Sequence, residues 1–165
     1  MFRVFLGALL LATAACGSTS YTENGPNMIT THRGHGGYVL PILKQYDTWA
    51  QQGKFLRIDG PMISADAMGA FGYKGRWCYT EDAVFRGHAA YELHKGRSES
   101  GTVWLTSRLP EKLAAAFRKH PAYQDYEQLT YWGASTLRAL IPEYECRDHG
   151  DQVVASAEAP VAVIE

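Results

Sequence analysis

The chain has 165 residues, 46% of them hydrophobic and 20% charged, and its formal net charge is −1. This composition is typical of a globular protein with one hydrophobic core, so a single domain is expected. Because the lysines and arginines are neither in excess nor clustered, the sequence argues against a nucleic-acid partner.

Residues 1–15 have the pattern of a signal peptide. Arg3 supplies a short positive segment, Val4 to Ala12 form an apolar stretch, and Thr13-Ala14-Ala15 is a small-residue cleavage zone. The apolar stretch is too short to span a bilayer permanently. We therefore expect export of the chain to the periplasm of a bacterium.

Cys16 follows the cleavage zone directly, and the surrounding residues resemble the lipobox of bacterial lipoproteins. That resemblance implies that Cys16 is acylated and anchors the protein to an envelope membrane. Thr13 departs from the motif, because a lipobox prefers leucine there. The alternative is cleavage after Ala14, which would leave Cys16 as an unpaired thiol, a liability in an exported protein. Lipid anchoring is the interpretation we favour.

The other two cysteines are Cys78 and Cys146. In an oxidising compartment, two cysteines are expected to form one disulfide, here joining the middle of the domain to its last ordered segment. The alternative is a pair of separate buried thiols.

Small and polar residues at 16–27 predict a flexible tether, residues 28–146 the domain, and residues 147–165 a disordered tail. The elements expected in chain order are a strand at 28–31, a glycine-rich loop at 32–37, a helix at 38–51, a strand at 55–59, a helix at 65–71, strands at 76–80 and 83–88, a surface loop at 94–101, and helices at 109–120 and 134–140. This order predicts an α/β fold in which helices cover a small sheet.

Three features of the domain suggest chemistry: Gly36-Gly37 opens a helix, Ser64 precedes the next helix, and His88 ends a short strand. A serine hydrolase needs a nucleophile, a base that takes its proton, and amides that bind the oxyanion, and each has a candidate here. Taken singly, Ser64 is better explained as an N-cap and His88 as a structural histidine, and only their order and spacing together favour the chemical interpretation. No G-x-S-x-G motif surrounds Ser64, which disfavours an α/β-hydrolase.

The segments "HRGHGG", "IDGPMISADAMGAFG" and "RWCYTEDAVFRGHAAY" together resemble the core of ClpP-like serine peptidases, which have the ClpP/crotonase fold. Residues 60–64 have the G-x-x-x-S form of that family. The likeness is closer to small exported members with "SAC" and "F-x-F-H" motifs, which here read Ser64-Ala65-Asp66 and Phe85-Arg86-Gly87-His88. The resemblance covers roughly residues 28–92.

The resemblance implies that Ser64 attacks a peptide or protein substrate and that His88 acts as general base. It also implies that the backbone amides of Gly37 and Ala65 form the oxyanion hole. Asp66 stands where these exported members have cysteine, and a carboxylate pointing inward there would oppose an oxyanion.

The family's third catalytic residue is an aspartate near the segment that here reads "EQLTYWGAS", and no aspartate occupies the matching place. Asp125 and Glu127 lie near it and are the candidates to orient His88. A Ser–His dyad or a backbone carbonyl would also serve.

A second function class stays open, namely a non-catalytic envelope lipoprotein that uses the same fold for binding or scaffolding. The missing aspartate and the presence of Asp66 favour it, whereas the retained serine, histidine and glycine pair favour the enzyme. No cofactor is expected, and no metal, because His32 and His35 have no third ligand nearby. The sequence is compatible with an oligomer.

Overall fold

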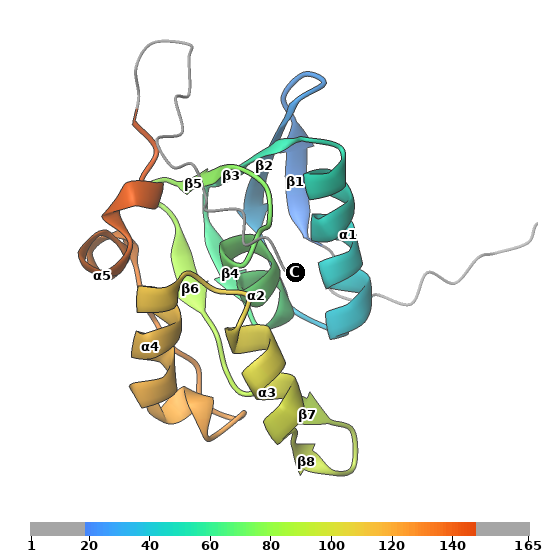
Figure 1. The fold of residues 1–165 in the computed structure, drawn as a ribbon, viewed down its shortest axis with the longest axis vertical. Helices are drawn as coiled ribbons and strands as arrows, with labels where there is room; N and C mark the ends of the chain where they lie inside the picture. The colour runs from blue at the N-terminus through green and yellow to red at the C-terminus, as the bar shows by residue number, and fades with distance from the viewer. Residues whose placement is uncertain (1–18, 148–165) are drawn as a thin grey trace, which may run out of the picture.

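A four-stranded sheet forms one end of the molecule in the computed structural model, which describes residues 19–147 (Figure 1). In spatial order its strands are β1 (Ser20–Glu23), β2 (Met28–Arg33), β3 (Phe55–Ile58) and β5 (Trp77–Tyr79). The last three strands run parallel, and β1 lies antiparallel at the edge. With five α-helices in the described residues, the chain is an α/β protein, as the sequence predicts.

Strand β1 falls inside the segment predicted to be a flexible tether, and that prediction is wrong for residues 20–23. Ser20 pairs with Arg33 and Glu23 with Ile29, and the Tyr21 ring packs edge-on against Trp49 at 4.9 Å. Composition misled the prediction, because an exposed edge strand can be polar when its backbone is paired. Residues 16–18 lie outside the described residues, as do the predicted signal peptide and the tail beyond residue 147.

A second sheet holds the two short parallel strands β4 (Pro61–Ile63) and β6 (Val84–Arg86). The Gly34 amide, just beyond β2, donates a hydrogen bond to the Pro61 carbonyl at 3.0 Å. The carboxyl ends of β2, β4 and β6 therefore lie side by side. In parallel arrangements the segments that follow such ends commonly form a ligand site.

Helices α1 (Val39–Gln51) and α2 (Ala65–Phe71) follow β2 and β4. Helix α1 buries Ile42, Leu43, Tyr46 and Trp49, the face that its apolar spacing predicts. Its contact with α2 depends on Gly69, where an added Cβ would lie 2.4 Å from the Tyr46 ring. This close approach lets α2 pack directly against α1.

The remainder of the domain is helical apart from the hairpin of β7 (Tyr91–Glu92) and β8 (Gly96–Arg97). The helical elements are α3 (Glu99–Thr106), α4 (Glu111–Lys119), η1 (Pro121–Tyr123), α5 (Ala134–Leu140) and η2 (Pro142–Tyr144). The prediction of a surface loop at 94–101 is wrong, because this segment contains β8 and the start of α3. At that helix start the Ser98 hydroxyl accepts a hydrogen bond from the Gly101 N–H. In Figure 1, α3 and the hairpin extend from the end opposite the β1–β2 turn.

Cys78 in β5 and Cys146 after η2 form a disulfide, which confirms the predicted pairing. The Cys146 amide also donates to the Tyr79 carbonyl at 2.9 Å, so the last segment of the domain is held to the edge of the sheet. No helix within residues 19–147 is long and apolar enough to cross a membrane.

Candidate active site

Ser64 occupies the turn between β4 and α2 with φ 56° and ψ −123°. An ordinary N-cap serine has extended backbone and accepts a hydrogen bond from the first turn, whereas Ser64 makes no such bond. A positive φ at a residue other than glycine costs about 1–3 kcal/mol and is concentrated at functional sites. The N-cap explanation therefore does not account for this serine.

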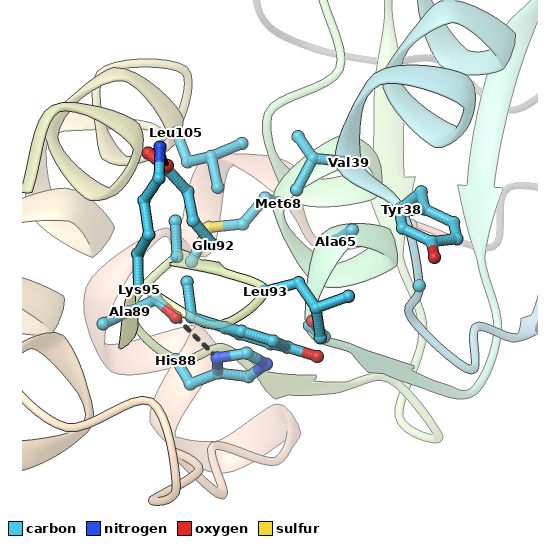
Figure 2. A pocket seen from close by; sticks show the side chains of 14 residues that line it. Tyr38, Val39, Ala65, Met68, His88, Ala89, Glu92, Leu93, Lys95 and Leu105 are labelled. Carbon is cyan, nitrogen blue, oxygen red and sulfur yellow. Dashed lines mark hydrogen bonds and ion pairs between the residues drawn. The ribbon is translucent and has the colours of Figure 1, made fainter. Parts of the chain in front are cut away.

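A cavity of about 700 Å³ lies in front of Ser64 (Figure 2). Four of its lining residues are those that the sequence singled out: Gly37, Ser64, Ala65 and His88. Its walls are mostly apolar and include Val39, Met68 and Leu105, which Figure 2 shows around the cavity. Such a concave, largely apolar space with a few polar groups is typical of a small-molecule or peptide site.

Register explains why the serine and the histidine line the same cavity. Ile63 pairs with Arg86 across β4 and β6, and the Ser64 amide donates to the Arg86 carbonyl at 2.8 Å. Ser64 is the first residue after β4, and His88 is the second after β6. Both side chains thus leave the same end of two adjacent strands. Within residues 19–147 the Ser64 hydroxyl makes no hydrogen bond, and none joins it to the His88 ring.

The His88 ring is oriented by the backbone. Its Nδ1 lies 2.7 Å from the Ala89 carbonyl oxygen, a contact drawn as a dashed line in Figure 2. A carbonyl can only accept, so Nδ1 carries the proton and Nε2 of the neutral ring is the acceptor. This is the tautomer that a general base needs to take a serine proton.

Neither predicted third residue is brought to His88. Asp125 instead accepts hydrogen bonds from the Glu127 amide and the Gln128 side chain, and Glu127 is exposed. Among residues 19–147, no hydrogen bond or ion pair joins either carboxylate to the imidazole. The Ala89 carbonyl fills the orienting position, one of the arrangements that the sequence left open.

The predicted oxyanion donors both line the cavity, Gly37 at the end of the glycine-rich loop and Ala65 at the start of α2. Neither amide donates a hydrogen bond within residues 19–147. The loop lies close to the serine, because a Cβ added at Gly36, whose φ is 76°, would lie 2.7 Å from the Ser64 Cβ. Glycine is thus required at that position.

Asp66 does not face the cavity. Its side chain is fully buried and accepts hydrogen bonds from the Gly36 amide at 3.0 Å, from the Tyr46 hydroxyl at 3.2 Å and from the Thr19 hydroxyl. Burial is the main effect on this carboxyl and raises its pKa, while these three donors lower it. The carboxyl therefore holds the glycine-rich loop from behind and does not oppose an oxyanion.

Sequence reasoning missed the β7–β8 hairpin, which covers one side of the cavity. The Tyr91 ring lies over the His88 ring, with the two centroids 6.3 Å apart, and Leu93 points into the cavity (Figure 2). The available signal was the turn, in which His94 and Gly96 adopt positive φ. With strands of two residues each, the alternation was too short to recognise.

Burial lowers the pKa of His88 below its usual value near 6.5, and the hydrogen bond to the Ala89 carbonyl opposes that shift. A general base works only when neutral, so reaction at Ser64 should accelerate as the pH rises through this lowered pKa and then level off. We expect the acidic limb of the pH–rate profile for a serine-directed phosphonate to have its midpoint below pH 6.5. A midpoint above that value would contradict the role given to this environment.

Within residues 19–147, no cluster of three or more histidine, cysteine or acidic side chains is arranged to hold a metal ion. Among the polar groups that line the cavity are the Ser64 hydroxyl and the His88 imidazole, a pair that can support acyl transfer. Comparison of the chain with protein-family models, with curated proteins and with solved structures gave no match.

Proposed function

We propose that this protein is an exported, lipid-anchored serine hydrolase with a ClpP/crotonase-like fold, and that it cleaves peptide or protein substrates. The observation that supports this most strongly is the strained backbone of Ser64, whose hydroxyl makes no capping hydrogen bond. The hydroxyl lines the same cavity as the His88 ring, which carries its proton on Nδ1. A serine with a purely structural role would gain no stability from that strained conformation.

In the proposed reaction, Ser64 Oγ attacks the substrate carbonyl carbon as its proton passes to His88 Nε2. The carbonyl oxygen becomes an oxyanion and accepts hydrogen bonds from the Gly37 and Ala65 amides. The protonated ring then donates to the leaving amine, which breaks the peptide bond and leaves an acyl-serine. A water molecule, deprotonated by Nε2, hydrolyses that ester and restores the serine.

The fold assignment and the location are supported by separate observations. The order of a strand, a glycine loop, a helix, and a strand-turn-helix carrying the serine is the order that the resemblance implies. A disulfide is typical of an oxidising compartment, which supports export. Cys16, the proposed acylation site, lies outside the described residues, and fatty-acid labelling of wild type against Cys16→Ala would test it.

The function is tested by reacting the folded, full-length protein with a fluorophosphonate. Wild type should be labelled, and Ser64→Ala should not. His88→Ala should react at least about 100-fold more slowly, the lower end of what a general base contributes. Ser107→Ala is the matched control, since Ser107 is an exposed serine at the end of α3 whose hydroxyl donates to the Trp104 carbonyl. If folded wild type with its disulfide formed stays unlabelled, the non-catalytic binding or scaffolding role replaces the enzyme.

A further inference from the structure

An exposed apolar surface surrounds the start of α1. It consists of Tyr38, Leu40 and Pro41, and we call it the helix-start patch. Tyr38, the N-cap of α1, and Leu40, in its first turn, are 70% and 73% exposed, which is high for large apolar residues. Basic residues flank the patch, with exposed Arg33 at the end of β2 and exposed Lys44 one turn along the helix.

The described chain begins beside this patch. The Thr19 hydroxyl and the Gly36 amide bond the same Asp66 carboxyl, so Thr19 is fixed next to the loop that leads into Tyr38. Ser20 pairs with Arg33, which places the start of β1 at the same end of the sheet. Figure 1 shows β1 and α1 both starting at the end of the sheet remote from the β1–β2 turn.

Only Gly17 and Ser18 separate Thr19 from Cys16. Three residue steps span at most about 11 Å. An acyl group on Cys16 would therefore hold Thr19, the first residue that the structure describes, within a short distance of the headgroups. Exposed aromatic and aliphatic side chains with basic neighbours are the composition that binds the interface of an anionic bilayer.

We propose that the helix-start patch docks on the anionic membrane surface to which Cys16 is anchored, an inference that rests on the proposed lipid anchor and hydrolase. Tyr38 belongs both to the patch and to the lining of the cavity. On the other rim of the cavity, Tyr91 and Leu93 are 55% and 69% exposed. When the patch is docked in this orientation, the mouth of the cavity lies next to the bilayer surface. The substrates are accordingly peptide segments that lie on the membrane or emerge from it.

The test places an environment-sensitive fluorophore at either end of α1. With Cys16 acylated and Cys78 joined to Cys146, a cysteine introduced as Leu40→Cys or Gln52→Cys is the single free thiol. Gln52, exposed at the far end of the helix, is about 18 Å away and is the matched control. Each labelled protein is reconstituted in vesicles of phosphatidylethanolamine and phosphatidylglycerol.

Fluorescence at position 40 should rise several-fold on reconstitution and be quenched by spin-labelled lipid, while position 52 should be unchanged. Equal signals at both positions, or a larger signal at 52, would overturn the docking. A rise at position 40 in vesicle-free Cys16→Ala protein that grows with protein concentration would assign the patch to a second copy of the chain. If the wild-type protein does not stay bound to the vesicles, both the proposed docking and the proposed lipid anchor are wrong. None of these readouts depends on catalysis, so phosphonate labelling reports separately on the proposed function.

Discussion

Asp66→Ala should lower the free energy of unfolding by about 3 kcal/mol, because it leaves buried donors without an acceptor. The Gly36 amide and the Tyr46 hydroxyl both lose their partner inside the domain, and the Thr19 hydroxyl loses its partner at the edge. Denaturant unfolding measures the change. The matched control is Asp82→Ala, an exposed aspartate in the turn before β6, which should change stability by less than about 0.5 kcal/mol.

The same substitution should slow phosphonate labelling in the protein that remains folded, because Asp66 fixes the loop that carries the Gly37 amide. A destabilisation no larger than that of Asp82→Ala would contradict the buried network.

Asp66→Asn tests the same buried carboxyl through the pH dependence of stability. Because burial raises the folded pKa of Asp66, the unfolded chain ionises first, and this group's contribution to stability falls as the pH rises from the usual 3.8 to the raised value. Relative to the Asn variant, wild type should lose stability across that window.

Removing the disulfide by the double substitution Cys78→Ala and Cys146→Ala should lower the free energy of unfolding by about 4 kcal/mol. The cysteines are 68 positions apart, and a crosslink closing a loop of that size strongly restricts the unfolded chain. The bond also holds the segment after η2 to β5, where the Tyr144 and Trp77 rings stack at 4.3 Å.

Thermal or denaturant unfolding with and without reductant measures this effect in two independent ways. Reduction should destabilise wild type by about the same amount and leave the double variant unchanged. A drop below about 1 kcal/mol would mean that the last segment of the domain is held by its noncovalent contacts alone. The cavity lies away from this crosslink, so phosphonate labelling of the folded double variant should persist.

Elements with a strong repeating pattern could be predicted from the sequence. The apolar spacing of α1 and the small residues after Ser64 predicted both helices within one residue of their bounds. The strands β1, β7 and β8 were not predicted, since β1 is exposed along its whole length and β7 and β8 are two residues each. Helix α3 was not predicted because two of its three buried residues are the polar Thr102 and Thr106, while the apolar Trp104 is exposed.

The cavity is lined by the four residues that motif spacing identified as site candidates: Ser64, His88, Gly37 and Ala65. What spacing could not supply was the direction of each side chain. Asp66 follows Ser64 closely in sequence, yet its carboxyl turns to the back of the glycine loop. The orienting partner of His88 is a backbone carbonyl, which any residue at position 89 would offer and no sequence motif can encode.

The central claim is that Ser64 and His88 act together on a carbonyl held by the Gly37 and Ala65 amides. A crystal structure of the protein after reaction with a fluorophosphonate tests it most directly. The expected result is a bond from Ser64 Oγ to phosphorus, with the phosphoryl oxygen within about 2.7–3.1 Å of both amide nitrogens. His88 Nε2 should lie within about 3.2 Å of an oxygen on phosphorus. An unmodified Ser64, or an adduct whose phosphoryl oxygen points away from both amides, would contradict the claim.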